Sequence, residues 1–337
     1  LANSYLEAKS LKENKIECLV KFYLKVRKEA QFNLADGLGH KPHFSLRSFC
    51  RALYIASKNP CGHIIRSLYE AFCLSFLTQL DSNSYNIVEN MIVSHIVGPL
   101  QEFNSIMKHN IPKPYGSNSN YTQFEGYWIP LGSLEPAIPE DYILTKSVRK
   151  NLKDLVRIVS IGQLPVLLQG DTSVGKTSLI TYLAKASGHK CVRINNHEHT
   201  DLQEYVGSYA ADLSGKLVFR EGLLVEAMKK GHWIILDELN LAPSDVLEAL
   251  NRVLDDNREL FIPETQEMVK AHHNFMLFAT QNPPGSYGGR KMLSRAFRNR
   301  FIELHFNEIP PDELEIILHQ RCQMAPSYAK KMINVMK

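Results

Sequence analysis

The chain has 337 residues, of which 44% are hydrophobic and 22% charged, a composition typical of a soluble globular protein. The 39 basic and 35 acidic residues leave a net charge of +4, too small an excess to indicate nucleic-acid binding by itself. This length predicts about two to three domains.

The six cysteines form no C-x-x-C pair, and several lie at apolar positions, so we expect reduced, buried thiols in a cytosolic or nuclear protein. The most apolar stretch, 64–80, contains Arg66 and Glu70 and is not expected to span a membrane. No signal peptide opens the chain, and because it starts at Leu1 rather than Met we interpret it as a fragment.

Residues 1–107 predict a small helical bundle. Apolar residues recur at helical spacing in four segments, 12–32, 45–56, 64–80 and 86–97. Ser45 is placed to cap the second helix. Arg47 and Arg51 are four residues apart on that helix and therefore share one face. Taken alone, they predict a solvated charged surface.

Residues 108–141 predict a linker between domains. Five prolines and the run Gly116–Asn120 are incompatible with a helix, and we expect mobility near Ser117–Asn120. The Tyr127–Ile129 segment is too apolar for a free linker, so it is expected to dock on a neighbouring domain.

Helices and strands alternate from 142 to 307, after which 308–337 is again helical in pattern. Short apolar runs predict five strands, at 166–168, 191–194, 232–237, 275–280 and 301–306. The alternation predicts an α/β fold, with a parallel sheet covered by helices on both faces. Two insertions, 207–222 and 259–272, contain central turns and predict β-hairpins.

The first strand runs into the pattern G-x-x-x-x-G-K-[ST], and a helix follows it. Glycines let successive backbone N–H groups face phosphate oxygens, and the helix directs its positive end at the same charge. Lys176 is expected to reach the β- and γ-phosphates, and the Thr177 hydroxyl to ligate Mg²⁺. The expected nucleotide-binding residues are Gly170, Asp171, Thr172, Ser173, Val174, Gly175, Lys176, Thr177 and Ser178.

Polar side chains also end two later strands of the predicted sheet. Asp237 and Glu238 follow an apolar strand, at the edge where open α/β sheets bind ligands. Asp237 is expected to bind Mg²⁺, directly or through water, and Glu238 to orient or deprotonate the water that attacks the γ-phosphate. Asn282 ends the next strand, where its amide is expected to donate to the γ-phosphate and help to hold that water.

Three arginines, Arg295, Arg298 and Arg300, precede the last strand. A guanidinium group there could neutralise charge on a transferring phosphoryl group; the alternative is a basic helix end, which the helix dipole also favours. His197 and His199 form an H-x-H pattern without further ligands at a suitable spacing, and they predict a turn rather than a metal site.

Taken in order, these motifs resemble the core of the AAA+ ATPases. Gly170–Thr177, Asp237–Glu238, Asn282 and Arg295–Arg300 match Walker A, Walker B, sensor 1 and the arginine finger. The two predicted hairpins lie where the MoxR/dynein-like clade carries its helix-2 insert and its pre-sensor-1 hairpin. Within that clade the chain is similar to the midasin family through three segments, 193–201, 237–242 and 279–283.

The midasin resemblance implies a ring of AAA+ modules within one chain. It implies that 1–107 is the lid of a preceding module, 108–141 a linker, 142–307 the large nucleotide-binding domain of the next module, and 308–337 the start of a truncated lid. We assign the pair to the first lid and the second large domain. On this interpretation Arg47 matches a sensor 2 position. Arg300, with Arg298 as the second candidate, is the finger that serves the neighbouring module's nucleotide.

The resemblance also implies a function. The cofactors are ATP and Mg²⁺, and hydrolysis drives mechanical remodelling, with an implied role in the maturation and nuclear export of pre-60S ribosomal particles through release of assembly factors. The implied partners are the neighbouring AAA+ modules and the pre-60S particle with its assembly factors, in the nucleolus and nucleoplasm. Neither sequence-specific nucleic-acid binding nor a membrane is expected.

Three alternatives remain open. The module binds ATP without hydrolysing it and serves a structural or regulatory role; or it uses GTP; or it is a DNA-directed motor, against which the acidic hairpin tip Pro263–Glu267 argues. We expect the isolated chain to be weakly active, because no arginine reaches its site in trans.

Overall fold

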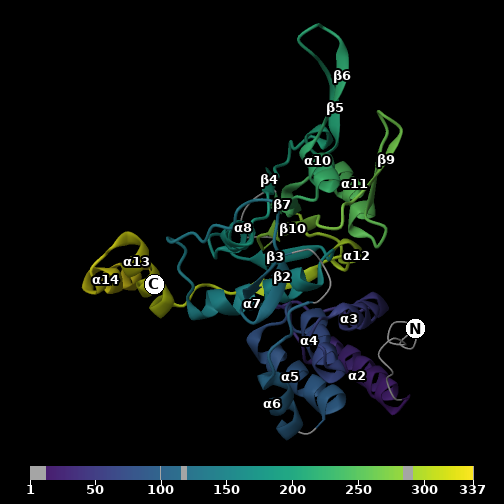
Figure 1. Ribbon diagram of the computed structural model, residues 1–337. Helices are drawn as coiled ribbons and strands as arrows, with labels where there is room; N and C mark the ends of the chain where they lie inside the picture. The colour runs from purple at the N-terminus through teal and green to yellow at the C-terminus, as the bar shows by residue number, and fades with distance from the viewer. Residues whose placement is uncertain (1–12, 99, 115–119, 284–290, 337) are drawn as a thin grey trace.

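The computed structural model describes residues 13–98, 100–114, 120–283 and 291–336. Figure 1 shows a helical N-terminal domain beneath an α/β domain, two hairpins projecting from the α/β domain, and a C-terminal pair of helices set apart to one side. Apart from Asn120, the segment that we expected to be mobile lies outside the described residues.

In its described part the N-terminal domain is helical, as predicted. Its elements are α2 (Glu13–Phe32), α3 (Leu46–Lys58), α4 (Ile64–Phe76), α5 (Ser82–Ile92), the π-helical turn η2 (Val93–Val97) and α6 (Leu100–Lys108). Ser45 caps α3 as predicted, because its hydroxyl accepts a hydrogen bond from the Ser48 amide at 3.4 Å. Phe22, Phe72 and Phe76 are fully buried and pack ring against ring with centroids 5.3–5.6 Å apart, which joins α2 to α4.

The segment predicted as a linker contains a β-hairpin that the sequence analysis missed. Its strands are β1 (Tyr121–Phe124) and β2 (Tyr127–Pro130). The two turn residues, Glu125 and Gly126, both have positive φ (47° and 87°), which is the geometry of a type I′ turn. Glutamate is an uncommon first residue for that turn, so the usual Asn-Gly or Asp-Gly signal was absent.

The predicted docking of Tyr127–Ile129 is confirmed. Tyr127 and Ile129 are 3% and 0% exposed. The Tyr127 hydroxyl donates to Glu70 Oε1 of α4 at 2.7 Å, and the Trp128 indole donates to the Ile111 carbonyl at 3.0 Å. The hairpin is therefore part of the packed interface between the two domains.

A five-stranded parallel sheet forms the α/β domain, which confirms the predicted fold class. The strands are β3 (Val166–Gly170), β4 (Cys191–Asn195), β7 (Trp233–Asp237), β10 (Met276–Gln281) and β11 (Ile302–Phe306). They lie in the order β11-β3-β10-β7-β4, and each neighbouring pair is parallel. The helices around them are α7 (Lys146–Ile161), α8 (Lys176–Ala186), α9 (Leu202–Val206), α10 (Leu223–Lys230), the 3₁₀ turn η3 (Leu239–Leu241), α11 (Ser244–Leu254) and α12 (Arg295–Arg298).

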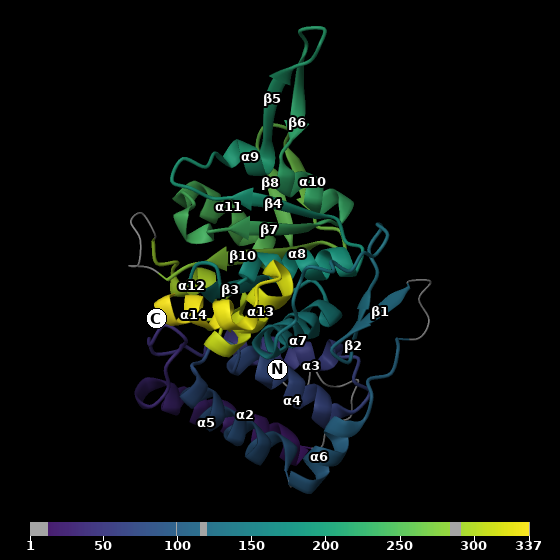
Figure 2. The same ribbon diagram turned by 90° about the vertical axis from the view of Figure 1, so that its left-hand side faces the viewer.

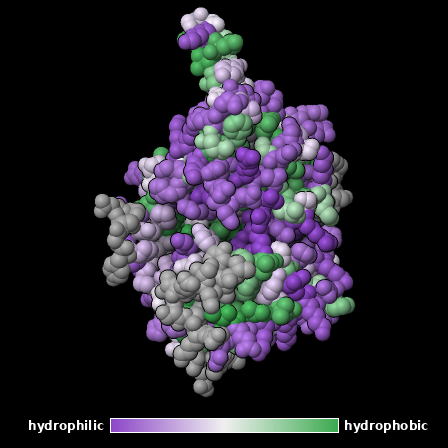
Figure 3. Space-filling model, turned by 90° about the vertical axis from the view of Figure 1, so that its right-hand side faces the viewer, coloured by the Kyte–Doolittle hydropathy of each residue, from purple (hydrophilic) through white to green (hydrophobic). Residues whose placement is uncertain are grey.

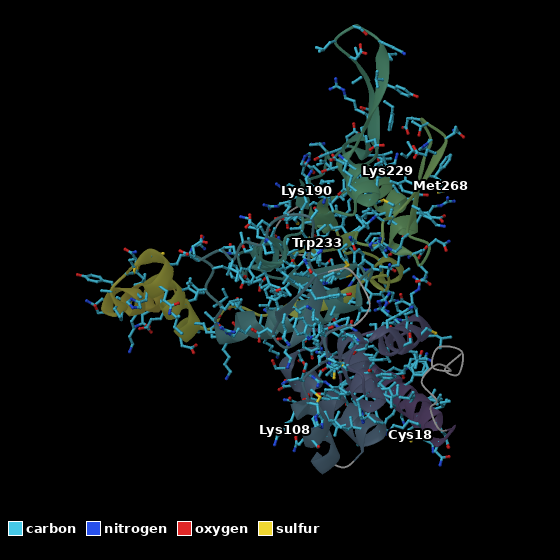
Figure 4. All side chains as sticks on the ribbon, in the orientation of Figure 1. Cys18, Lys108, Lys190, Lys229, Trp233 and Met268 are labelled. Atoms are coloured by element: carbon cyan, nitrogen blue, oxygen red, sulfur yellow. The ribbon has the colours of Figure 1, made fainter. Side chains whose placement is uncertain are left out.

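Helices cover both faces of this sheet (Figure 2). Because side chains alternate along a strand, Val166 and Leu168 pack into one core with α7, α8 and the helical domain, whereas Leu167 packs into a second core with α10 and α11. The strands are buried on both sides, which explains their continuous apolar pattern. Trp233 lies near the middle of the domain (Figure 4) and is 1% exposed.

Both predicted insertions are antiparallel hairpins that project from the same end of the domain (Figure 1). They are β5 (Gly207–Ala211) with β6 (Leu217–Glu221), and β8 (Glu259–Ile262) with β9 (Glu267–Lys270). The Tyr209 hydroxyl of the first donates to the Glu264 carbonyl of the second at 3.3 Å. Figure 3 shows the β5–β6 hairpin standing clear of the body, with hydrophobic side chains near its tip, among them the exposed Leu213 and Leu217.

The C-terminal pair consists of α13 (Pro311–Cys322) and α14 (Pro326–Met336). Glu313 of α13 accepts a hydrogen bond from the Ser147 amide of α7 at 3.0 Å, which attaches the pair to the α/β domain. Within the described ranges, no helix is long and apolar enough to cross a bilayer.

Charged side chains are buried along the seam between the helical and α/β domains. Glu70 of α4 is 2% exposed and pairs with Arg157 of α7 at 2.5 Å. Arg51 of α3 donates to the carbonyls of Asn299 and Phe301, and Thr78 donates to the Glu303 carbonyl at 2.6 Å. These bonds attach the helical domain to edge strand β11 and to the segment that leads into it.

Candidate nucleotide-binding site

The phosphate loop joins β3 to α8. Gly175 has φ 89°, and a Cβ atom built there would meet no atom within 4 Å, so the space above the loop is open. Gly170 has φ 157° and also a role that was not predicted: a Cβ there would lie 2.4 Å from the Phe306 carbonyl oxygen. Glycine at 170 therefore allows the close approach of β11. Asp171, Thr172 and Ser173 are exposed along the loop.

Lys176 begins α8 and folds back across the loop. Its ammonium group is buried, with the residue 7% exposed, and donates to the carbonyls of Gly170 and Asp171 at 2.8 and 2.6 Å. It also donates to Asn282 Oδ1 at 2.8 Å. The structure thus brings the predicted lysine and the predicted asparagine, 106 residues apart, into direct contact. All three acceptors are neutral oxygens, which a phosphate oxygen can replace.

Asp237 ends β7 beside the start of α8. Its carboxylate accepts a hydrogen bond from the Thr177 hydroxyl at 3.0 Å, so the two predicted Mg²⁺ ligands are adjacent. Thr280 and Arg193 also donate to this carboxylate. Sequence reasoning did not assign those two residues. Thr280 lies within an apolar strand, so it gave no polar signal. The contact of Arg193 depends on the pairing of β4 with β7, which the local sequence does not show.

The oxygen donors of Thr177 and Asp237 suit Mg²⁺, which takes few protein ligands and completes its shell with phosphate oxygens and water. No group of three or more His, Cys, Asp or Glu side chains within the described ranges could hold a metal without such help. His197 and His199 lie in a turn, where the Thr200 hydroxyl accepts a hydrogen bond from the His197 amide at 2.8 Å.

Glu238 has φ 50°, a left-handed conformation that is uncommon for a residue other than glycine and costs about 1–3 kcal/mol. Its amide donates to Thr280 Oγ1 at 3.0 Å. Just before it, both the amide and the side chain of Asn196 donate to the Asp237 carbonyl, at 3.0 and 2.9 Å. These bonds hold the turn, and the Asn282 amide donates to Glu238 Oε1 at 3.2 Å. The carboxylate therefore contacts Asn282, the residue that also accepts a hydrogen bond from Lys176.

The three candidate arginines differ in their surroundings. Arg298 pairs with Glu303 at 2.5 Å and with Asp36 of the helical domain at 3.7 Å, and its side chain is 16% exposed. Arg300 donates to Asp255 Oδ1 at 3.0 Å and to the Ala296 carbonyl at 2.9 Å. Arg295 is exposed, and its guanidinium makes no hydrogen bond or ion pair with the residues that the structure describes.

Arg300 and Arg47 meet at the far end of the sheet from the phosphate loop. Arg47 lies 3.4 Å from Asp255, the residue that also binds Arg300. With Arg51 and Arg258 they line a cavity of about 350 Å³. Arg300 precedes β11, whereas the phosphate loop follows the parallel strand β3. A five-residue strand, about 16 Å long, therefore separates this cavity from Lys176.

The charge of this cavity is predominantly basic. Burial lowers the pKa of Arg51 to about 10, so its guanidinium stays cationic at neutral pH. The carboxylates of Asp255 and Asp256 face the four arginines. Guanidinium groups bind carboxylate and phosphate oxygens in a bidentate manner, so the cavity is suited to an anionic ligand.

Known proteins resemble this chain in both of its domains. The family model of the midasin AAA lid domain matches residues 1–98, and that of the AAA domain of the dynein-related subfamily matches 165–301. Midasin of Dictyostelium discoideum is 54% identical over 330 residues, which are 96% of this chain and 6% of that protein. Midasin of Giardia intestinalis is 46% identical over 318 residues, 88% of this chain and 6% of that protein.

The chain spans about 6% of the length of these two relatives. A crystal structure of a protein from Cytophaga hutchinsonii superposes with a TM-score of 0.40 at 20% identity, over 51% of this chain and 53% of that one. That likeness is too slight to carry an argument.

Proposed function

Because the chain joins a midasin AAA lid domain to an AAA domain of the dynein-related subfamily, and so belongs to the midasin family of AAA proteins, we propose that its phosphate loop binds Mg-ATP and hydrolyses it to drive mechanical remodelling. The observation that carries this proposal is the convergence of Lys176, Asn282 and Glu238 at one edge of the sheet. Thr177 and Asp237 lie beside them.

Each residue has a role that its contacts support. Lys176 moves from its carbonyl acceptors to the phosphates. Asn282 holds Glu238 through its amide, and Glu238 positions and deprotonates the attacking water. Thr177 and Asp237 would hold Mg²⁺, and a metal ion there would supply neutralisation of charge on the phosphates.

The basic cavity at the opposite end of the sheet supports a second part of the proposal. Arg300 and Arg47 would contact the nucleotide of the preceding module, with Arg300 as the arginine finger. Its distance from Lys176 excludes it from this chain's own site. This division of labour requires the neighbouring modules of the ring as partners. Arginines supplied in trans accelerate phosphoryl transfer by about 10³–10⁵.

The midasin relatives support a further inference about the work that is done. We infer that the energy of hydrolysis releases assembly factors from pre-60S ribosomal particles, in the nucleolus and nucleoplasm. Co-sedimentation of the intact protein with pre-60S particles, enriched by Glu238→Gln, would support this role. Equal sedimentation of the wild-type protein and the variant would count against it.

The test of the ATPase proposal compares wild-type, Lys176→Ala and Glu238→Gln forms of the intact protein. We expect Lys176→Ala to abolish nucleotide binding at this site. Glu238→Gln should retain ATP and lower its turnover by about 10²–10⁴, the contribution of a general base. Arg193 forms an ion pair with Asp237, the proposed Mg²⁺ ligand, and so competes with the metal for this carboxylate. That competition favours the alternative of a regulatory, non-hydrolysing site. Undiminished turnover in Glu238→Gln with binding intact would establish that alternative.

A further inference from the structure

A chain of polar side chains, largely buried, connects the candidate nucleotide site to helix α12 (Arg295–Arg298), which ends two residues before the candidate finger Arg300. It starts at Gln281, which directly precedes Asn282 at the end of β10. Gln281 and Gln169 are register partners on neighbouring strands, and they are 5% and 4% exposed. The Gln281 amide donates to Gln169 Oε1 at 2.8 Å. Gln169 itself directly precedes Gly170 of the phosphate loop.

The same Gln169 oxygen also accepts a hydrogen bond from Arg298 at 3.4 Å. Arg298 binds Glu303 of β11 through Nε and through a terminal nitrogen, at 3.2 and 2.5 Å, and approaches Asp36 of the helical domain. Glu303 raises the pKa of Arg298, although burial opposes this, so the guanidinium is a permanent cation. The arginine thus touches the phosphate-loop strand, the last strand and the helical domain at once.

This environment is unsuited to a residue that reaches into a neighbouring module. Withdrawal of Arg298 would leave the buried Glu303 without its closest cation and Gln169 with one donor fewer. Arg300, by contrast, has only the partly exposed Asp255 as its ion-pair partner among the described residues, and it borders the basic cavity. The two arginines are therefore built for different tasks.

We propose that Arg298 is a positioning residue, and that the bonds Gln281–Gln169–Arg298 transmit nucleotide occupancy at Lys176 to helix α12 and hence to the placement of Arg300. This inference rests on the proposed function, since it presupposes a nucleotide at the phosphate loop. Nucleotide draws Lys176 and Asn282 toward the phosphates. When Asn282 moves, the adjacent Gln281 moves with it. The Gln281 amide makes the first hydrogen bond of the series that ends at Arg298. Occupancy of one site would then set the finger offered to the preceding one.

Hydrogen–deuterium exchange of the intact protein tests this, with and without the slowly hydrolysed analogue ATPγS and Mg²⁺. Peptides over 168–180 report nucleotide binding at the loop. Peptides over 294–303 report the amides of Arg298, Asn299, Arg300 and Phe301, each of which donates to a backbone carbonyl. The Lys176→Ala variant isolates this site, because whatever α12 response it loses comes from the chain's own loop and not from another module.

We expect nucleotide to slow exchange in α12 by about fivefold, the change that one net hydrogen bond produces. The double variant Gln169→Met/Gln281→Met replaces both amides with apolar side chains of similar shape, so neither amide is left without its partner, and Arg298 keeps its bonds to Glu303. It should keep the protection of the loop and lose the α12 response, as Lys176→Ala does. Arg298→Lys keeps the positive charge but not the planar guanidinium that binds Gln169 and Glu303 together, so this variant should also lose the α12 response.

Gln31→Met, on the exposed face of α2, is the matched control and should respond as the wild type does. If the double variant binds nucleotide and α12 still slows fivefold, the inference is wrong. If ATPγS leaves the wild-type loop unprotected, the proposed function fails and this inference falls with it. The two sets of peptides therefore separate the two failures.

Discussion

Buried cations occur in two regions of this molecule, and the two regions hold them through different kinds of acceptor. Along the seam between the domains, Glu70 has Arg157 at 2.5 Å, and Glu303 has Arg298 at 2.5 Å. At the candidate nucleotide edge, Lys176 donates to two backbone carbonyls and to the side-chain amide oxygen of Asn282.

The difference teaches what each region is built to do. A buried carboxylate with a buried guanidinium has a partner that water cannot replace, so the seam holds its geometry. If Lys176 binds phosphate as we propose, phosphate oxygens can take the place of these neutral acceptors. The same contrast distinguishes the fixed Arg298 from Arg193, which is 53% exposed and pairs with Asp237.

The largest effect on stability is expected at the seam. Arg157→Met leaves Glu70 buried without its closest cation and should lower the free energy of unfolding by about 3–5 kcal/mol, measured by urea denaturation. The double variant Arg157→Met/Glu70→Met should recover part of that loss, because no buried carboxylate remains, while the Tyr127 hydroxyl and Arg66 lose Glu70 as a partner. Arg149→Met breaks a pair whose side chains are 56% and 25% exposed, and it should cost less than about 1 kcal/mol. Equal losses in Arg157→Met and Arg149→Met would contradict the comparison.

The next largest effect concerns a buried titratable ring whose hydrogen-bond partner is the neutral Ser187 hydroxyl. His189 stacks on Trp233 with centroids 4.4 Å apart, and burial lowers its pKa from 6.5 to about 4. Protons therefore bind the unfolded chain more tightly than the folded one. The stability that this ring contributes is complete above pH 6.5 and is lost as the pH falls toward 4, by up to about 3 kcal/mol.

His189→Phe keeps the stacking and removes the titration. The difference in unfolding free energy between pH 7 and pH 4 should shrink by about 3 kcal/mol in this variant, as measured by urea denaturation at both pH values. Substitution of the exposed His199 by Phe should leave that difference unchanged. The same pH dependence in His189→Phe as in the wild type would show that this ring does not titrate between those limits.

The smallest effect is expected at the nucleotide edge. Arg193→Met removes a half-exposed cation from Asp237, so Mg²⁺ should support ATP binding at a concentration about two- to fivefold lower, which matches the small worth of an exposed ion pair. Titration of Mg²⁺ at fixed ATP measures this. A higher Mg²⁺ requirement in Arg193→Met would show instead that the arginine helps to bind the nucleotide.

The sequence predicted best those features that depend on residues close together along the chain. The phosphate loop, the acids after β7 and both projecting hairpins follow from local patterns, and so does the parallel sheet. The β1–β2 hairpin was missed because its turn uses glutamate. Other contacts were missed for a different reason: the bonds from Arg193 and Thr280 to Asp237, the pairing of Asp255 with two arginines, and the Gln169–Gln281 pair. Each joins residues on different elements, and only the strand order β11-β3-β10-β7-β4 brings them together.

The left-handed backbone at Glu238 has a consequence for how this chain can change over time. Glycine or asparagine would relieve a torsional energy of about 1–2 kcal/mol at that position, but neither carries a carboxylate. If Glu238 is the base that we propose, position 238 is a place where thermostability and turnover are in direct opposition. A lineage that no longer needed the carboxylate would gain stability there by a single substitution, so drift at 238 is an early sign of a module that has ceased to turn over.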